Sequence, residues 1–139
     1  MLGKRNPAVY GTTTLHEIEQ MVVELGKELG CKIDYRQSNS EAHLIDVIQQ
    51  ASTHANGIIL NAGGLTHSSI SLRDAVEIAR DLRTPTVEVH ISNIHARESF
   101  RHVSVFSAAP SVVLEQICGK GPEGYLLALH ALVAYIKPK

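Results

Sequence analysis

The sequence has few cysteines, no long apolar run and no excess of charge of either sign. Its 2 cysteines, Cys31 and Cys118, show no metal-binding spacing and form no disulfide framework. No apolar run reaches the roughly 18 residues that a membrane span needs, and the N-terminus shows no signal-peptide pattern. These absences argue against a membrane protein or a disulfide-stabilised secreted one, and we expect a cytoplasmic protein.

The balance of charge excludes further classes of function. The chain has 13 Lys and Arg residues against 14 Asp and Glu residues, a net charge of −1 over 139 residues. It carries no basic stripe and no block of like charge, so no nucleic acid partner is expected. The composition, 44% hydrophobic and 19% charged, is that of a globular protein, and the length predicts one domain, residues 1–139.

Several common catalytic motifs are missing as well. The sequence has no HExxH motif and no Cys–His spacing, so we expect no metal site. It has no Walker A loop, no GxGxxG fingerprint and no GxSxG elbow, which disfavours hydrolysis by a serine, a cysteine or a metal. No lysine lies in the apolar setting that a Schiff-base lysine needs.

What the chain does contain is an alternation of helical and strand-like segments. The spacing of apolar residues predicts helices over 15–29, 40–56, 68–83 and 125–136. Strands are predicted at 31–37, 57–64, 84–90 and near 111–118. Thr14 and Glu17 form a capping box at the start of the first of these helices. This alternation implies an α/β fold, a parallel sheet with helices on both faces.

Polar clusters follow two of the predicted strands. One is residues 61–67, and the other ends the stretch "TVEVHISNIHARESFR" at 86–101. Ligands of parallel α/β sheets bind beyond the carboxyl ends of the strands. Gly63 and Gly64 allow close backbone approach, and free N–H groups before the helix at 68 are suited to a carboxylate or a phosphate. A glycine turn that only ends the strand is the alternative.

The second cluster contains the strongest candidates for acid–base chemistry. Glu88 and His90 are two residues apart on one strand and so share a face, where the carboxylate can orient the imidazole. A hydrogen-bonded core or interface histidine is the alternative. Arg97 and Arg101 are four residues apart, which suits either the binding of an anion or surface salt bridges with Glu98.

A third group lies near the start of the chain. In the loop 3–12, Arg5 lies close in sequence to Tyr10, and a neighbouring cation favours a phenolate. A tyrosine packed at a turn is the alternative. Because the loop carries two glycines and this tyrosine, it is also a candidate lid.

At this point the motifs show a resemblance. The stretches "LGKRNPAVYGTTTL", "RQSNSEAHLIDVIQQA", "ILNAGGLTHSSISLRDA", "VEVHISNIHARESFR" and "GPEGYLLALHAL" occur in the order seen in type II 3-dehydroquinate dehydratase. The chain resembles this family over nearly its whole length. The resemblance implies a flavodoxin-like doubly wound fold, no cofactor, and a homo-oligomer, a dodecamer of trimers. It also implies dehydration of 3-dehydroquinate to 3-dehydroshikimate by anti elimination through an enolate.

The resemblance assigns the catalytic roles by motif position. Tyr10 would be the base that removes the C2 proton, with its phenolate favoured by Arg5 and Arg97. His90 would be the general acid that protonates the departing C1 hydroxyl, oriented by Glu88. An elimination alpha to a ketone needs such a base and acid, and each gives about 10²–10⁴ in rate.

The resemblance also assigns residues that bind the substrate. The backbone N–H groups of Ile91 and Ser92, with the Asn61 side chain, would hold the substrate carboxylate. His67 and Arg101 would bind ring hydroxyls. Asp74 would reach the site of a neighbouring subunit.

The chain departs from the family pattern at its start. The family has a strand and a GPNLN turn before the segment that is here Leu2-Gly3, and this sequence begins at Met1 with neither. We therefore expect two strands without a ladder partner, lower stability and weakened catalysis, unless the coding sequence begins further upstream. The missing turn also carries the asparagine thought to steady the enolate through a bound water.

Two alternatives follow. One is a catalytically weakened or inactive homologue that serves as an anion-binding or scaffold protein, which the retained Tyr10 and His90 argue against. The other is a different hydroxy-acid dehydratase, which would require substitutions among the carboxylate-binding residues that the sequence does not show. The sequence leaves open whether the enzyme serves aromatic amino acid biosynthesis in the shikimate pathway or quinate catabolism.

Overall fold

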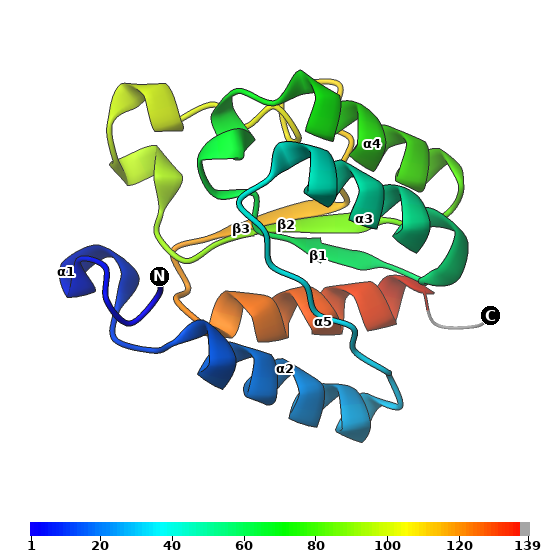
Figure 1. The fold of residues 1–139 in the computed structure, drawn as a ribbon, viewed down its shortest axis with the longest axis horizontal. Coiled ribbons are helices and arrows are strands. Elements are labelled where there is room, and N and C mark those ends of the chain that lie inside the picture. Colours follow the sequence, from blue (N-terminus) through cyan, green and yellow to red (C-terminus); the bar gives the residue numbers. More distant parts are fainter. Residues whose placement is uncertain (137–139) are drawn as a thin grey trace.

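A computed structural model describes residues 1–136 of the chain as helices around a small sheet (Figure 1). In chain order the elements are α1 (Pro7–Tyr10), α2 (Leu15–Leu29), α3 (Glu41–His54), β1 (Ile58–Leu60), η1 (Gly63–His67), α4 (Ile70–Asp81), β2 (Thr86–His90), η2 (Ile94–Ala96), η3 (Ser99–Arg101), β3 (Glu115–Cys118) and α5 (Glu123–Ile136). No helix within this range is long and apolar enough to span a membrane.

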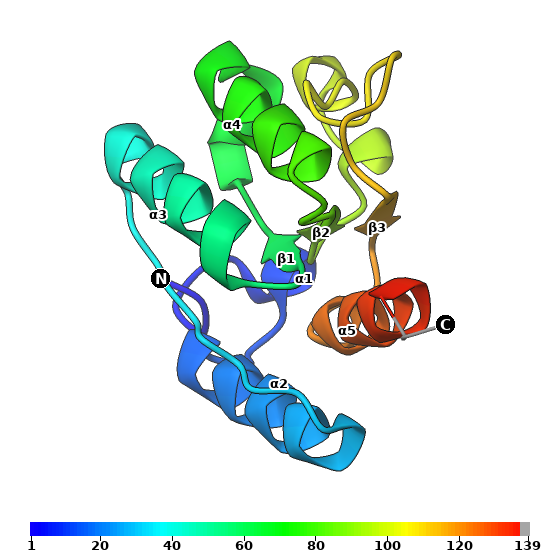
Figure 2. The same cartoon turned by 90° about the vertical axis from the view of Figure 1, so that its right-hand side faces the viewer.

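The sheet is parallel and is covered on both faces. Its described strands lie in the order β1-β2-β3, with Leu60 paired to Glu88 and Glu88 paired to Gln116. Figure 2 shows α3 and α4 on one face of the sheet and α2 and α5 on the other. The predicted α/β architecture is therefore confirmed, and all three strands point their carboxyl ends to the same edge.

Side-chain caps mark the starts of three helices, and the start of α2 is the one that the sequence predicts. The Thr14 hydroxyl accepts from the Glu17 N–H at the start of α2, and the Glu17 carboxylate accepts from the Thr14 N–H, so the capping box is confirmed. The Ser40 hydroxyl accepts from the His43 N–H at the start of α3, and the Ser69 hydroxyl accepts from the Leu72 N–H at the start of α4. Gly30 ends α2 at φ 75°, a left-handed conformation that glycine adopts without steric cost.

The central strand β2 is buried along its whole length, with apolar side chains on one face and polar side chains on the other. Val87 and Val89 pack against Ala128 and Leu132 of α5. A Cβ atom at Gly124 would lie 3.2 Å from Val89 Cγ1, so the missing side chain lets α5 approach the sheet closely. The alternate positions of β2 carry polar side chains on the opposite face. Burying polar side chains costs free energy unless they are hydrogen-bonded. The polar face of β2 is therefore a candidate part of a functional site.

The prediction of a strand at 31–37 is wrong. These residues are not assigned to a strand, and Figure 2 shows the stretch (cyan) leading from α2 to α3 apart from the sheet. Cys31 donates its N–H to Gly26 O at 2.6 Å, and Ile33 packs with the residues of α2 and α5. No strand among residues 1–136 lies alongside this segment, so its backbone has no ladder to join.

Other predicted segments differ in extent or conformation. The strand predicted at 57–64 is confined to Ile58–Leu60, and the one predicted near 111–118 begins at Glu115. The loop 3–12 contains one helical turn, α1, because Pro7 suits the first helical position and the Asn6 side chain accepts from the Ala8 N–H. That turn sets the direction of Tyr10.

Candidate active site

The first part of the site is a tyrosine hydroxyl held by two arginines. Arg5 donates from Nη2 to Tyr10 Oη at 2.8 Å, and its guanidinium carbon lies 3.8 Å from the centroid of the tyrosine ring. Arg97 donates from Nη1 to the same oxygen at 2.8 Å and to Ser92 Oγ at 3.3 Å. The contact that the sequence suggested for Arg5 is therefore present, and Arg97 adds a second guanidinium at the same oxygen.

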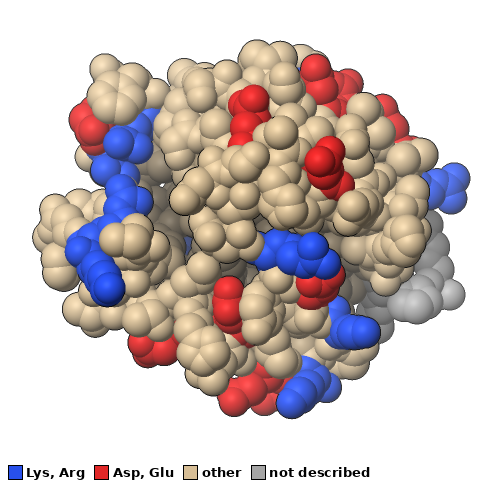
Figure 3. All heavy atoms as spheres, in the orientation of Figure 1, with Lys and Arg blue, Asp and Glu red and all other residues tan. Residues whose placement is uncertain are grey.

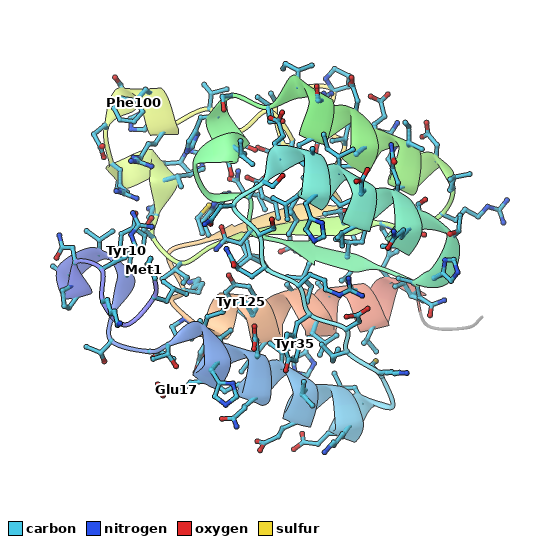
Figure 4. All side chains as sticks on the ribbon, in the orientation of Figure 1. Met1, Tyr10, Glu17, Tyr35, Phe100 and Tyr125 are labelled. Atoms are coloured by element: carbon cyan, nitrogen blue, oxygen red, sulfur yellow. The ribbon has the colours of Figure 1, made fainter. Side chains whose placement is uncertain are left out.

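These basic side chains lie at the edge where the strands end. Figure 3 shows Lys and Arg atoms (blue) gathered beside a hollow at the left of the molecule. Figure 4 shows Tyr10 at the inner side of α1 and Phe100 on the segment above it. The Arg101 guanidinium stacks on the Phe100 ring, 5.2 Å from its centroid. The edge therefore offers several cations to an anionic ligand.

The second part is a buried carboxylate–imidazole pair. His90 Nε2 lies 2.5 Å from Glu88 Oε2, and the relative exposures of the two residues are 5% and 0%. The prediction that they share one face of the strand is confirmed. Because His90 Nε2 is engaged by the carboxylate, Nδ1 is the ring nitrogen left to face a ligand.

The sequence did not predict the neighbours of this pair. Gln116 donates from Nε2 to Glu88 Oε2 at 3.2 Å and to Ser107 Oγ at 3.0 Å. His95 Nε2 lies 3.0 Å from Gln116 Oε1. Glutamine in a predicted strand gives no local signal, and only the pairing of Glu88 with Gln116 across β2 and β3 places the two together.

Asn61, at the end of β1, is held by a tyrosine that the sequence also did not single out. Its Nδ2 donates to Tyr125 Oη at 2.8 Å, and its Oδ1 accepts from the Gly63 N–H at 3.1 Å. Burial raises the pKa of Tyr125 above its usual value, and the hydrogen bond from Asn61 opposes this only in part. Tyr125 therefore stays protonated, and Tyr10 is the better candidate for a base.

The expected row of free N–H groups after β1 is only partly present. The Gly63 N–H is engaged by Asn61, and the Leu65 N–H donates to Ala62 O within the turn η1. The Ser68 and Ser69 N–H groups both donate to Leu65 O. The short helical turn uses these donors internally, so this segment is less suited to an anion than its glycines suggested.

The remaining predicted residues lie around the same edge. His67 Nδ1 lies 2.8 Å from Val103 O, which fixes the orientation of its ring. Arg101 donates from Nε to Glu98 at 3.2 Å, and this bond, after a backbone hydrogen bond, helps to hold the pKa of Glu98 below its usual value. The Gly121 N–H donates to Ile91 O and the Gly119 N–H to Ser92 O, at 3.2 and 3.1 Å, which steadies the segment after β2.

Asp74 stands apart from the others. It lies in α4 and is exposed, and none of the hydrogen bonds or ion pairs found among residues 1–136 involves its side chain. The structure of one chain thus does not bring it to the tyrosine and histidine. Within the same residues, no group of three His, Cys, Asp or Glu side chains is arranged to hold a metal ion.

Together, a tyrosine between two cations and a carboxylate-paired histidine, at the carboxyl edge of a parallel sheet, are an arrangement suited to acid–base chemistry on an anionic ligand. Comparison with known proteins identifies the family. The family model described as "Dehydroquinase class II" matches residues 1–133, and the chain belongs to this family.

Relatives and solved structures give the same result. The chain is 51% identical over 132 residues to 3-dehydroquinate dehydratase 1 of Agrobacterium fabrum, covering 95% of this chain and 87% of that one. It is 51% identical over 139 residues to the 3-dehydroquinate dehydratase of Ruegeria pomeroyi, covering 100% and 89%. The crystal structure of the type II dehydroquinase of Propionibacterium acnes superposes with a TM-score of 0.87 at 41% identity, covering 96% and 88%. These findings confirm the flavodoxin-like α/β fold class.

Proposed function

We propose that this chain, acting as a single domain, dehydrates 3-dehydroquinate to 3-dehydroshikimate. The observation that carries the proposal is the Tyr10 hydroxyl between Arg5 and Arg97, at the same edge of the sheet as the His90–Glu88 pair. The relatives named as 3-dehydroquinate dehydratases support it. As a lyase on this substrate, the enzyme would belong to the shikimate pathway. We also propose that it acts in the cytoplasm.

In the proposed mechanism Tyr10 is the base. As a phenolate stabilised by the two guanidiniums, it takes the proton from C2 of the substrate, and the electron pair moves onto the ketone oxygen as an enolate. Tyr125 is the other tyrosine at this edge, and burial raises its pKa, so it is less suited to this step. Tyr10, which both arginines contact, is therefore the proposed base.

His90 is the proposed acid in the second step. With Nε2 bound to Glu88, the protonated ring presents Nδ1–H to the departing C1 hydroxyl. The enolate electrons form the double bond, the C1–O bond breaks, and the proton from His90 completes the water that leaves. Asn61 and the backbone N–H groups of Ile91 and Ser92 would bind the carboxylate in this scheme, and His67 and Arg101 the ring hydroxyls.

An absorbance assay for 3-dehydroshikimate tests the proposal. Wild type should turn over 3-dehydroquinate, and Tyr10→Phe should lose about 10²–10⁴ in kcat because the base is removed. Tyr135→Phe is the matched control, since Tyr135 is 64% exposed on α5, and should keep full activity. Binding of 3-dehydroquinate without turnover by folded wild type would instead support the anion-binding or scaffold alternative.

We further propose that the site is completed by a second copy of the chain, within the trimers of a dodecamer. Ile70, Asp74 and Ile78 follow one another at four-residue spacing on α4, and Leu82 ends the same row. The three apolar members are 59%, 49% and 54% exposed. An exposed apolar stripe around a carboxylate suits a contact that carries Asp74 to a neighbour's site.

Mixing two inactive variants tests this arrangement. If Asp74 serves a neighbour's site, co-refolded Tyr10→Phe and Asp74→Ala chains should form about a quarter of sites with both wild-type residues and regain that share of activity. Sedimentation should show the trimer-based assembly. Mixed oligomers without any regain, although each variant assembles, would contradict the shared site.

A further inference from the structure

We infer that Gln116 is a positioning residue that holds the Glu88 carboxylate in the orientation that His90 needs. Gln116 is not among the residues that the family motifs assign to the site, and it reaches no substrate in the proposed scheme. It would act through Glu88 alone. For catalysis the inference rests on the proposed function, whereas its structural part concerns this chain whether or not it turns over substrate.

The sheet itself brings the two residues together. Glu88 of β2 and Gln116 of β3 are register partners in parallel strands, so both side chains leave the sheet on one face. The Gln116 Nε2 group then donates to Glu88 Oε2 at 3.2 Å, and the same oxygen bonds His90 Nε2 at 2.5 Å. The two contacts meet at one carboxylate oxygen.

The amide of Gln116 is fixed at both ends. Its Nε2 also donates to Ser107 Oγ at 3.0 Å, and its Oε1 lies 3.0 Å from His95 Nε2. A flipped amide would turn its oxygen toward the Glu88 carboxylate, which would place two acceptors against each other. The carboxylate therefore determines that Gln116 presents its NH₂ group, and the contacts to His95 and Ser107 hold the amide in place.

Burial makes that donor important. Glu88 is 0% exposed, and its other oxygen, Oε1, has no hydrogen-bond partner within residues 1–136. Gln116 is thus the one described donor to this carboxylate besides His90. A buried carboxylate that loses a donor is free to rotate, and the histidine that it orients loses its fixed ring position. The expected consequence is a slower chemical step with little change in substrate binding.

The test compares Gln116→Leu with wild type. Leucine has a similar size and no donor, so kcat should fall about 10-fold, the size expected for one hydrogen bond to a charged group, while KM stays within about twofold. Gln50→Leu is the matched control, because Gln50 is exposed on α3, and it should leave both constants unchanged. Unchanged kcat in folded Gln116→Leu would overturn the inference.

A second measurement does not depend on turnover. The ¹⁵N spectrum of His90, at a pH where its ring is neutral, should show the single Nε2–H tautomer in wild type and a mixture of tautomers in Gln116→Leu. If wild type has no dehydratase activity, the proposed function fails but this spectrum still tests the positioning role. A His90 spectrum unaltered by the substitution would overturn that role.

His95→Ala provides a variant at an exposed position if Gln116→Leu does not fold. It removes one of the two anchors of the amide and leaves Gln116 and Glu88 in place. We expect a loss in kcat of about threefold, smaller than that for Gln116→Leu, and a partial change of the His90 tautomer. Wild-type kcat together with a wild-type His90 spectrum in this variant would contradict the fixed amide.

Discussion

Arg97 Nη1 lies 2.8 Å from the Tyr10 hydroxyl, although 87 positions separate the two residues in the chain. The Arg97 side chain is 20% exposed and also donates to Ser92 Oγ, so it links the N-terminal turn α1 to the segment that follows β2. Arg97 therefore connects the proposed base, Tyr10, to the segment that directly follows the proposed acid, His90. Substitution of Arg97 should affect both the charge at Tyr10 and the position of α1.

Arg97→Lys should lower kcat by about 10–100-fold. Lysine keeps the positive charge but replaces the planar fork with a single ammonium group, which cannot hold both Tyr10 and Ser92 in the same geometry. Steady-state kinetics measure the effect, and Arg80→Lys on the exposed face of α4 is the control. Wild-type kcat in Arg97→Lys would show that the fork is dispensable.

Tyr125→Phe should have a smaller effect than loss of Tyr10. It removes the hydroxyl that accepts from Asn61 Nδ2, so the amide that we propose for the substrate carboxylate loses one restraint. We expect KM to rise about three- to tenfold and kcat to stay within about threefold, as for loss of one neutral hydrogen bond. A loss of kcat as large as in Tyr10→Phe would mean that Tyr125 takes part in the chemistry.

Arg73→Met should destabilise the fold without touching the site. The Arg73 guanidinium donates to the backbone carbonyls of Val105, Ala108 and Pro110, and so holds the loop before β3. Loss of these charge-assisted bonds should cost about 2–3 kcal/mol in the free energy of unfolding. Urea unfolding measures it, with Arg83→Met as the control, because the Arg83 side chain is exposed and makes none of the hydrogen bonds or ion pairs found among residues 1–136. A cost equal to that control would contradict a structural role for Arg73.

Cys118 should react slowly with thiol reagents. Burial, its largest influence, raises the pKa of this thiol, and the nearby Glu88 charge acts in the same direction. A raised pKa lowers the thiolate fraction at any given pH, so the labelling rate should reach its half-maximum at a pH above the usual value of about 8.5. Ellman's reagent on Cys31→Ser chains measures this, and a half-maximum at or below that pH would contradict the prediction.

Much of the fold followed from local pattern. The capping box of Thr14 and Glu17 places the start of α2, because it satisfies backbone donors within a few residues. The shared face of Glu88 and His90 follows from the alternation of a strand. Arg5 and Tyr10 are close enough in sequence for their contact to be predicted. These features depend on neighbours along the chain.

Other features depend on which segments meet in space. Residues 31–37 have the composition of a strand but lack a neighbouring ladder among the described residues, so no local pattern could give their conformation. The hydrogen bond of Gln116 to Glu88 exists because the register of β2 and β3 pairs them. The sequence by itself determined the helices, the parallel architecture and the candidates for the acid–base residues. The tertiary structure alone decided which partners hold those residues, since hydrogen bonds between distant segments depend on packing.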